Sequence, residues 1–292
     1  MSSSCLVHAR APPARAIGES IVVPMSKSTN DSDGLLLAKY RRAIIFGAGE
    51  YYEEMPFVPP QAYVIAADGG YDHVMSLGIE PHVLVGDMDS IQERDELDLA
   101  PHVIALPSEK DDSDMLAAVK HAWALGMREF EFYGVFGGRM DHSIANLQTA
   151  AKIAAAGGVA FLHGDHVITT VIQDATMTFP AGYVAAGRPL SVFAHSSVCA
   201  HVSITGLKYC VDDVEFSNLE PMGLSNEFLP DTPAEISVDG GALLVIYPSE
   251  APTPRVESRV PPVDSADFGQ LTQKKSAYLQ PNAGAKRGRH VA

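Results

Sequence analysis

Between residues 43 and 172, short apolar runs alternate with longer segments of helical periodicity, and brief turns rich in glycine separate them. The apolar runs are those in RRAIIFGAG, QAYVIAADGG, PHVLVGDMDS, HVIALPS, REFEFYGVFGG and VAFLHG, and the helical segments are YDHVMSLGI, DMLAAVKHAWALG and DHSIANLQTAAKIAAAGG. Strands that alternate with helices through short connections assemble into a parallel sheet with helices on both faces. The alternation therefore predicts a doubly wound α/β domain over residues 40–172.

The pattern changes after about residue 173, where helical periodicity ends and short β-type runs separated by turn residues follow. These runs predict a smaller all-β sandwich over residues 173–250. Residues 1–39 are rich in Ser, Ala and Pro, and residues 251–292 are polar and interrupted by proline. Such composition is typical of chain that buries little apolar surface, so both ends are expected to be disordered extensions.

The net charge, the lengths of the apolar runs and the number of cysteines restrict the classes of binding partner and the cellular compartment. The formal net charge is −15, whereas phosphate backbones need surfaces rich in Lys and Arg, so we expect no nucleic acid partner. No apolar run reaches the roughly 18 residues of a membrane helix, so we expect no membrane partner. The 3 cysteines are too few and too scattered for a disulfide framework, which favours a reducing, cytoplasmic setting.

Acidic residues follow three successive predicted strands. Asp68 follows YVIAA, Asp87 and Asp89 follow VLVG, and Asp114 lies in the loop after VIAL. Because ligands of open parallel sheets bind outside the carboxyl ends of the strands, we expect these side chains at one edge. In extended backbone, Asp87 and Asp89 would lie roughly 6.6 Å apart on one face, with room for a cation between them. Mg²⁺ prefers oxygen ligands and shares its shell with phosphates, so the sequence predicts a Mg²⁺ site.

Residues suited to phosphate accompany these acids. Lys110 in EKDDSD and Arg139 in GGRMDH can bind phosphate oxygens, and the two glycines before Arg139 allow close backbone approach. The next helix begins near Asp141, so its N-terminal amides can add to an anion site, whereas His142 by itself is more simply structural. Any one of the aspartates alone is more simply an ordinary turn or cap residue, as Asp112 or Ser113 is for the next helix, and only the four together favour a metal site.

Taken in order, the motifs resemble those of the thiamine pyrophosphokinase family. The matching pieces are ADGG (67–70), GDMDSI (86–91), EKDDSD (109–114), GGRMDHSIANL (137–147), GLKY (206–209) and GLSNEF (223–228). The departures are Met88, Ser113 and Leu224, where the family usually has Phe, Thr and Ile. None of them removes a carboxylate or a cation, and both tails fall outside the resemblance.

The resemblance implies an α/β domain followed by a β-sandwich, in a homodimer whose active site lies at the subunit interface. It implies that ATP and thiamine react, with Mg²⁺, to give AMP and thiamine diphosphate. Asp87, Asp89 and Asp114 would then hold the metal, with Asp68 close by. The residues on the nucleotide-phosphate side would be Lys110, Arg139, Asp141 and His142, and those that hold thiamine would be Ser225 and Asn226.

In the implied reaction, the thiamine hydroxyl attacks the β-phosphorus of ATP and AMP leaves, so positioning and charge neutralisation carry the catalysis. Either Asp68 or Asp89 would accept the hydroxyl proton. Two other functions remain open from the sequence. A D-x-D motif at a strand end also serves metal-dependent glycosyltransferases, and a thiamine- or nucleotide-sensing protein can keep the same fold without catalysis. Release of AMP distinguishes the kinase from both.

Overall fold

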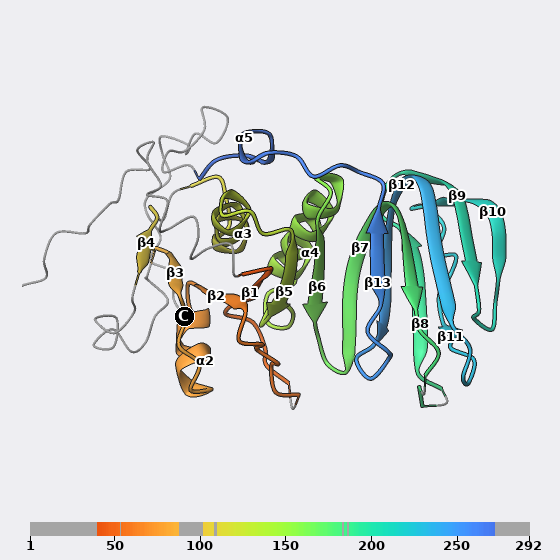
Figure 1. Cartoon of the computed structure of the whole chain (residues 1–292), viewed down its shortest axis with the longest axis horizontal. Helices are drawn as coiled ribbons and strands as arrows, with labels where there is room; N and C mark the ends of the chain where they lie inside the picture. Colours follow the sequence, from red (N-terminus) through yellow and green to blue (C-terminus); the bar gives the residue numbers. More distant parts are fainter. Residues whose placement is uncertain are drawn as a thin grey trace, which may run out of the picture.

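The computed structural model describes residues 40–271 except 53, 88–101, 108–109, 183 and 186. These residues form a 13-stranded sheet that runs through the whole molecule (Figure 1). Its first part is parallel and covered by helices, and its second part is antiparallel. The predicted fold class, a parallel-sheet α/β unit followed by a β unit, is therefore confirmed. No helix in the described ranges is long and apolar enough to cross a membrane.

The parallel part has the spatial order β6-β5-β1-β2-β3-β4. Its strands are β1 (Arg42–Phe46), β2 (Ala62–Ala67), β3 (Val83–Gly86), β4 (Val103–Ala105), β5 (Glu129–Tyr133) and β6 (Val159–His163). Neighbouring strands pair in parallel, as β1 does with β2 on one side and with β5 on the other. Strands β1 and β2 are almost wholly buried, which explains why their sequences are continuous apolar runs.

Helices cover both faces of this sheet. Buried residues of α3 (Asp114–Ala124) and α4 (Met140–Ala155) pack against one face, in a core that includes Ile45 and Ile65. Helix α2 (Gly70–Ser76) packs against the other face through Tyr71 and Val74, with Ile44 in the same core. Because successive strand residues point to opposite faces, Ile44 and Ile45 enter different cores.

The β unit continues the sheet without a break. It contains β7 (Val167–Phe179), β8 (Pro189–Ala194), β9 (Val198–Thr205), β10 (Val211–Ser217), β11 (Asn226–Glu227) and β12 (Ala234–Pro248). Strand β7 pairs with β6 through residues 168–170 and with β12 along nearly its whole length. The predicted boundary between residues 172 and 173 thus falls inside a strand. Because β7 belongs to both units, they are joined by a shared ladder and not by a linker.

Strand β12 bends at residues 239–241, where its register against β7 shifts. The carboxylate of Asp174 accepts hydrogen bonds from the amides of Gly240 and Gly241, at 2.7 and 3.2 Å. Before the bend β12 pairs with β9, and after it β12 pairs with β8. The bend therefore divides the β unit into two layers around a second apolar core.

The segment 251–271, here called the C-terminal strap, is ordered. Its strand β13 (Arg255–Ser258) pairs antiparallel with residues 175–178 of β7, and helix α5 (Ser265–Phe268) lies beside α3. The composition predicts a disordered tail from residue 251, and this expectation is wrong for residues 251–271. The reason is tertiary: β6 pairs with only the first half of β7, so the second half offers an edge that β13 occupies.

The strap then returns to the α/β unit (Figure 1, blue). The ring of Phe268 stacks on Trp123 of α3 with 4.1 Å between centroids, and Phe268 is only 2% exposed. Trp123 Nε1 donates to the carbonyl of Val263 at 3.2 Å, and the Arg128 guanidinium lies 4.0 Å from the centre of the Trp123 ring. The strap thus contributes its own side chain to the core of the first unit.

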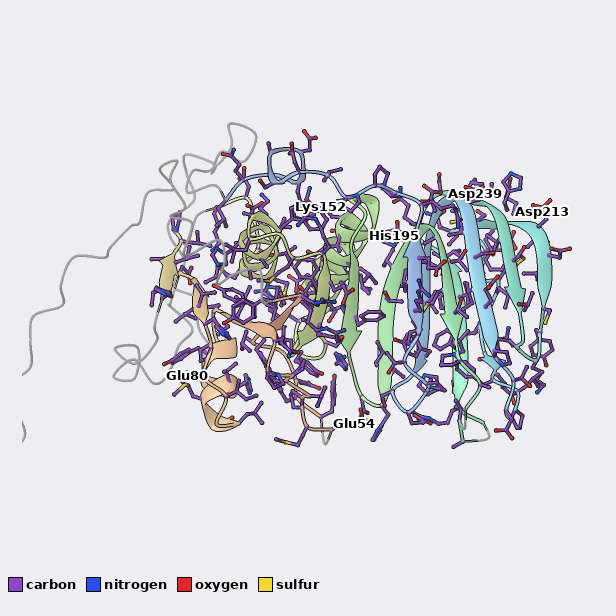
Figure 2. All side chains as sticks on the ribbon, in the orientation of Figure 1. Glu54, Glu80, Lys152, His195, Asp213 and Asp239 are labelled. Carbon is purple, nitrogen blue, oxygen red and sulfur yellow. The ribbon has the colours of Figure 1, made fainter. Side chains whose placement is uncertain are left out.

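Acidic side chains are spread over the surface. Glu80 lies at one end of the molecule, and Asp213 and Asp239 lie near each other at the other end (Figure 2).

Candidate functional site

The carboxyl ends of the parallel strands form one edge of the sheet. Ladder hydrogen bonds continue one residue past the strands: Gly47 N donates to Tyr133 O at 2.8 Å, Asp68 N to Val85 O at 2.9 Å and Leu106 N to Gly86 O at 2.8 Å. The residues that follow β1, β2, β3, β4 and β5 are therefore held level with one another. This is the edge at which the sequence predicts the acidic site.

Asp68 and Asp87 are neighbours at this edge. Asp68 follows β2 with a positive φ of 48°, a conformation that Asp tolerates better than most residues. A Cβ on Gly86 would lie 3.0 Å from Asp68 Cα, so a larger residue would have to displace Asp68 by a few tenths of an ångström, and glycine lets the two strand ends approach this closely without that shift. Asp87 comes directly after Gly86 and, like Asp68, is half-buried. The structure brings these two predicted residues together, while Asp89 lies outside the described residues.

Lys110 and Asp114 form an ion pair at the start of α3. Lys110 Nζ lies 2.9 Å from Asp114 Oδ1, and the Lys110 side chain is only 6% exposed. Ser113 is the cap of α3, because its Oγ accepts a hydrogen bond from Leu116 N at 3.2 Å. Asp112 instead pairs with Lys120 at 2.6 Å. Because Ser113 makes the capping hydrogen bond, the Asp114 carboxylate is not needed as a cap and pairs with Lys110 instead.

The donor chemistry at this edge suits a divalent cation. Asp68 and Asp87 offer carboxylate oxygens from adjacent strands, and oxygen ligands are what Mg²⁺ prefers. Across the described ranges, no group of three or more His, Cys, Asp or Glu side chains is placed to hold a metal ion. The predicted ligand set of Asp87, Asp89 and Asp114 includes one residue outside those ranges. The residues present fit the ion, and the full set of ligands stays a prediction.

The N-terminus of α4 presents a second predicted group. Arg139 forms a two-point contact with Asp141, through Nε to Oδ1 at 3.1 Å and Nη2 to Oδ2 at 2.6 Å. The hydrogen bond from Arg139 lowers the pKa of Asp141 to about 2. The backbone amide of His142 also donates to Asp141, and both charged side chains are 65% exposed. Asp141 therefore fixes the Arg139 side chain at the start of α4, and His142 is exposed beside them.

The predicted thiamine residues lie in the β unit. Ser225 is exposed and has a positive φ of 59°. Asn226 is 4% exposed, and its amide group is committed to the backbone. It donates to Tyr209 O at 2.7 Å and accepts from Tyr209 N at 3.0 Å and from Glu227 N at 2.9 Å. Asn226 therefore binds the GLKY loop to the GLSNEF loop, which explains why the two motifs occur together.

A pocket of about 240 Å³ lies between these two loops. Its lining is mostly apolar, and several large side chains around it are exposed, with Tyr209 at 60% and Leu224 at 64%. The residues that line it are Ile204, Tyr209, Val211, Phe216, Met222, Gly223, Leu224 and Asn226. A group of exposed apolar side chains beside a pocket is typical of a surface that binds a partner.

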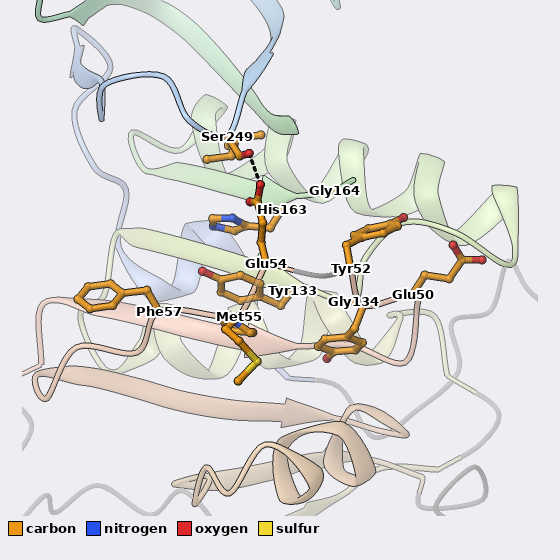
Figure 3. Close-up of a pocket in the computed structure, with 13 residues that line it drawn as sticks. Glu50, Tyr52, Glu54, Met55, Phe57, Tyr133, Gly134, His163, Gly164 and Ser249 are labelled. Atoms are coloured by element: carbon orange, nitrogen blue, oxygen red, sulfur yellow. Dashed lines mark hydrogen bonds between the residues drawn. The ribbon is translucent and has the colours of Figure 1, made fainter. Parts of the chain in front are cut away.

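A second pocket, of about 200 Å³, was not predicted (Figure 3). It lies beyond the ends of β1, β5 and β6, and residues 50–52 and 54–57, here called the loop 50–57, form much of its wall. The signal in the sequence is the run EYYEEMPF, in which aromatic and acidic residues follow the first predicted strand. Sequence reasoning missed it because the run matches no motif and lacks periodicity.

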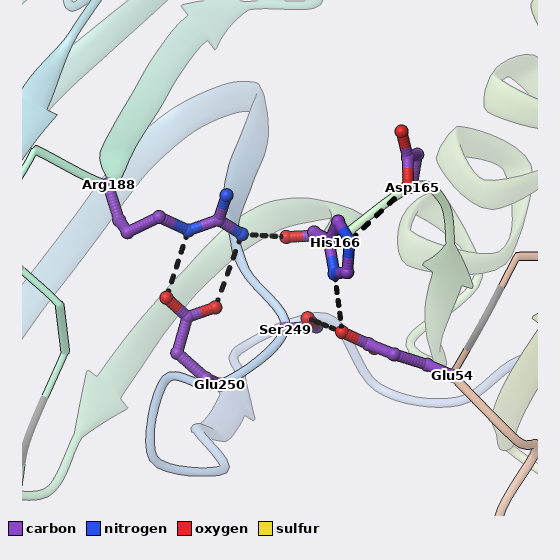
Figure 4. A network of polar contacts seen from close by, with 6 residues as sticks. All are labelled: Glu54, Asp165, His166, Arg188, Ser249 and Glu250. Atoms are coloured by element: carbon purple, nitrogen blue, oxygen red, sulfur yellow. Dashed lines mark hydrogen bonds and ion pairs between the residues drawn. The ribbon is translucent and has the colours of Figure 1, made fainter.

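Polar contacts anchor the outer wall of this second pocket (Figure 4). Glu54 Oε1 accepts a hydrogen bond from Ser249 Oγ at 2.7 Å and lies 3.0 Å from His166 Nδ1. Arg188 forms an ion pair with Glu250 at 2.9 Å and donates to the carbonyl of His166. The loop after β1 is thus tied to residues of the β unit.

Comparisons with known proteins agree with this architecture. The model of the family "Thiamin pyrophosphokinase, catalytic domain" matches residues 57–161, and that of "Thiamin pyrophosphokinase, vitamin B1 binding domain" matches residues 177–243. Together they match more than half of the chain. A thiamine pyrophosphokinase of Bacillus subtilis (strain 168) is 27% identical over 175 residues, which are 56% of this chain and 78% of that protein.

Solved structures give the same result for the fold. The crystal structure of the thiamine pyrophosphokinase from Bacillus subtilis has a TM-score of 0.64 at 22% identity, and the match covers 72% of this chain and 100% of that one. The structure of the thiamin pyrophosphokinase from Geobacillus thermodenitrificans has a TM-score of 0.59 at 26% identity, covering 72% and 98%. The architecture of the described residues is therefore that of these proteins.

Proposed function

Because the chain belongs to the thiamin pyrophosphokinase family of enzymes, we propose that it transfers the pyrophosphoryl group of ATP to the hydroxyl of thiamine. The products are thiamine diphosphate and AMP. The observation that carries this proposal is the common edge of the parallel strands, where Asp68 and Asp87 are neighbours and Lys110 pairs with Asp114. An edge with both acids and a cation suits a triphosphate bound with a divalent ion.

Each part of the edge has a role in this proposal. Asp87, Asp89 and Asp114 would hold Mg²⁺, with Asp68 beside them, and the ion supplies positive charge to the phosphate oxygens when bound. Lys110 and Arg139 bind phosphate oxygens and neutralise charge that develops in transfer. Either Asp68 or Asp89 accepts the proton of the attacking hydroxyl. The β unit supplies the thiamine side, where Ser225 contacts the substrate and Asn226 positions the loop around it.

The two sides of the reaction lie far apart in one chain. The GLSNEF loop belongs to the β8–β11–β12 region and Asp68 follows β2, at opposite ends of the sheet (Figure 1). From β12 to β2 there are five strand spacings, roughly 24 Å at about 4.8 Å each. A hydroxyl held at one end cannot reach a phosphate at the other. We therefore propose a homodimer in which the β unit of one subunit completes the active site of its partner.

The apolar surface around Tyr209 and Leu224 supports this arrangement, because a second copy would cover it. We also place the enzyme in the cytoplasm. Cys199 and Cys210 are free thiols, as expected in a reducing compartment.

The first test is to incubate the purified protein with ATP, Mg²⁺ and thiamine and to identify the products. Formation of AMP and thiamine diphosphate in equal amounts supports the proposal. It also contradicts a glycosyltransferase, which releases a nucleoside diphosphate, and a sensor, which releases nothing. Tight binding of either substrate without formation of AMP would refute the transfer.

The second test asks whether two subunits share the site. Asp87→Asn damages the phosphate edge and Ser225→Trp obstructs the thiamine loop, so each variant alone is expected to be inactive. In an equal mixture that exchanges subunits, about half of the dimers are mixed and each holds one intact site, which restores about a quarter of wild-type activity. If subunit exchange is verified and no activity returns, each site lies within one chain.

A further inference from the structure

The second pocket lies at the point where the direction of the chain through the sheet reverses. From β1 the chain moves to β2, β3 and β4 on one side, and β5 and β6 then lie on the other side of β1. In open α/β sheets, ligands bind in the crevice outside the carboxyl ends of the two strands at such a reversal. Residues that follow both strands line the pocket, with Glu50 to Tyr52 after β1 and Gly134 after β5.

The walls of the pocket suit a flat ring. Tyr133 stacks between His163, with 4.1 Å between centroids and 14° between planes, and Phe46 at 5.5 Å, so it presents its edge to the pocket and holds the His163 ring in place. Phe57 lies beside Tyr133 at the margin of the pocket and is 76% exposed (Figure 3). A hydrogen bond joins the Phe57 backbone to the Tyr133 hydroxyl and fixes the end of the loop. Aromatic side chains bind nucleobases by stacking with little dependence on their sequence or identity.

The negative charge of the pocket repels a phosphate, whereas a neutral ring that carries hydrogen-bond donors can bind there. Glu50 and Glu54 line it, and none of the described lining residues is Lys or Arg. Although burial raises the pKa of Glu54, hydrogen bonds from Ser249 and His166 lower it below its ordinary value overall. Glu54 therefore stays ionised at neutral pH. A carboxylate accepts hydrogen bonds and repels a carbonyl oxygen or a phosphate that approaches it.

Glu54 has an oxygen left for a ligand. Within the described part of the chain, the contacts from Ser249 and His166 both end on Oε1. They hold the carboxylate in place, and Oε2 stays open to a further hydrogen bond because the Glu54 side chain is 49% exposed. An exocyclic amino group of a base is a donor of this kind, whereas an oxo group at the same position is not.

The size and position of the pocket fit one part of a nucleotide. Its volume of about 200 Å³ lies below the roughly 300–1,000 Å³ of sites that enclose drug-sized ligands, so it holds a ring system and not a whole nucleotide. Gly134 and Asp68 follow β5 and β2, two strand spacings or roughly 10 Å apart. A ribose and its phosphates bridge such a span along the edge of the sheet.

We propose that this pocket binds the adenine base of the nucleotide donor, with Tyr133, His163 and Phe57 around the ring and Glu54 accepting from its 6-amino group. The assignment rests on the proposed function for the identity of the donor. It adds a preference for 6-amino over 6-oxo purines, and it gives a role to the loop 50–57, which no motif covers.

The test compares bases that differ only at that position. Adenosine and inosine carry neither phosphate nor metal, so calorimetric titration measures the base pocket apart from catalysis. A hydrogen bond to a charged group is expected to make adenosine bind about 10-fold to 100-fold more tightly than inosine.

The variants then test the residues. In Glu54→Gln the two nucleosides should bind with affinities that differ by less than about threefold, since an amide can both donate and accept. Phe57→Ala should weaken both nucleosides by about fivefold or more. Glu235→Gln, at an exposed side chain of β12, is the matched control and should leave the ratio unchanged.

The same variants give a kinetic result. The ratio of kcat/KM for ATP over ITP should fall in Glu54→Gln and persist in Glu235→Gln. The proposal is overturned if wild-type protein binds the two nucleosides equally, if the Glu54→Gln ratio equals that of wild type, or if thiamine displaces adenosine competitively. Absence of AMP in a wild-type reaction would refute the proposed transfer, while the nucleoside ratios would still decide whether the pocket recognises adenine.

Discussion

Replacement of Phe268 by alanine tests whether the C-terminal strap is part of the core. Phe268 is 2% exposed, stacks on Trp123 at 4.1 Å, and has Lys152 Nζ 5.0 Å from its ring centre. Removing a fully buried Phe side chain costs about 1.5–3 kcal/mol of transfer free energy. The aromatic pair adds about 0.5–1.5 kcal/mol and the cation contact about 0.5–1 kcal/mol. We therefore expect Phe268→Ala to lower the free energy of unfolding by about 3–5 kcal/mol, as for other buried aromatic truncations.

The assay uses the intrinsic fluorescence of the protein. Trp123 is the only tryptophan in the sequence, so its emission reports directly on the side chain that Phe268 covers. Urea titration followed by fluorescence and by circular dichroism gives the global free energy of unfolding. If the strap detaches before the rest unfolds, the emission will shift to the red at lower urea than the loss of secondary structure.

Phe57→Ala is the matched control, because Phe57 is 76% exposed and its loss should change stability by less than about 1 kcal/mol. The reasoning is refuted if Phe268→Ala costs less than about 1 kcal/mol and leaves the Trp123 emission unchanged. That result would mean that the strap rests on the surface and that Trp123 is buried without it.

Three further predictions follow from the site and the core. Asp87→Asn should reduce turnover by about 100-fold or more while circular dichroism stays unchanged, and near-normal turnover at limiting Mg²⁺ would refute the metal assignment. Leu224→Glu, at a side chain that is 64% exposed, should give folded monomers without activity, which light scattering and product analysis will show. Burial, with a smaller effect of His102, lowers the pKa of His121 to about 4. The unfolded chain then binds the extra proton, so the free energy of unfolding should fall by about 3 kcal/mol as the pH drops from about 6.5 to about 4. His121→Gln should lose this part of the pH dependence in urea titrations, and parallel curves for the two proteins would contradict it.

The parallel sheet and its acidic edge could be predicted from the sequence for a local reason. Buried parallel strands are continuous apolar runs, and the residue after each run lies at the carboxyl end of a strand. Asp68 and Asp87 therefore had to lie at the same edge once the sheet was predicted. The order of the motifs then indicated the family, which the comparisons confirm.

Other features depend on partners that are distant in the sequence. Asn226 is an ordinary loop residue by pattern, and only the structure shows that its amide group binds the backbone of Tyr209 and Glu227. The loop 50–57 has no periodicity, and its position is set by contacts with Ser249 and His166. A pocket built from such contacts leaves no local pattern.

By itself, the sequence determined the strand–helix order, the buried faces and the residues delivered to one edge, because each follows from spacing along the chain. Tertiary structure decided that β7 serves both units, that residues 255–258 of a largely polar segment become a strand, and that Phe268 covers Trp123. The physical reason is that these features require a vacant strand edge or an uncovered ring, and such vacancies exist only after the rest of the chain has folded.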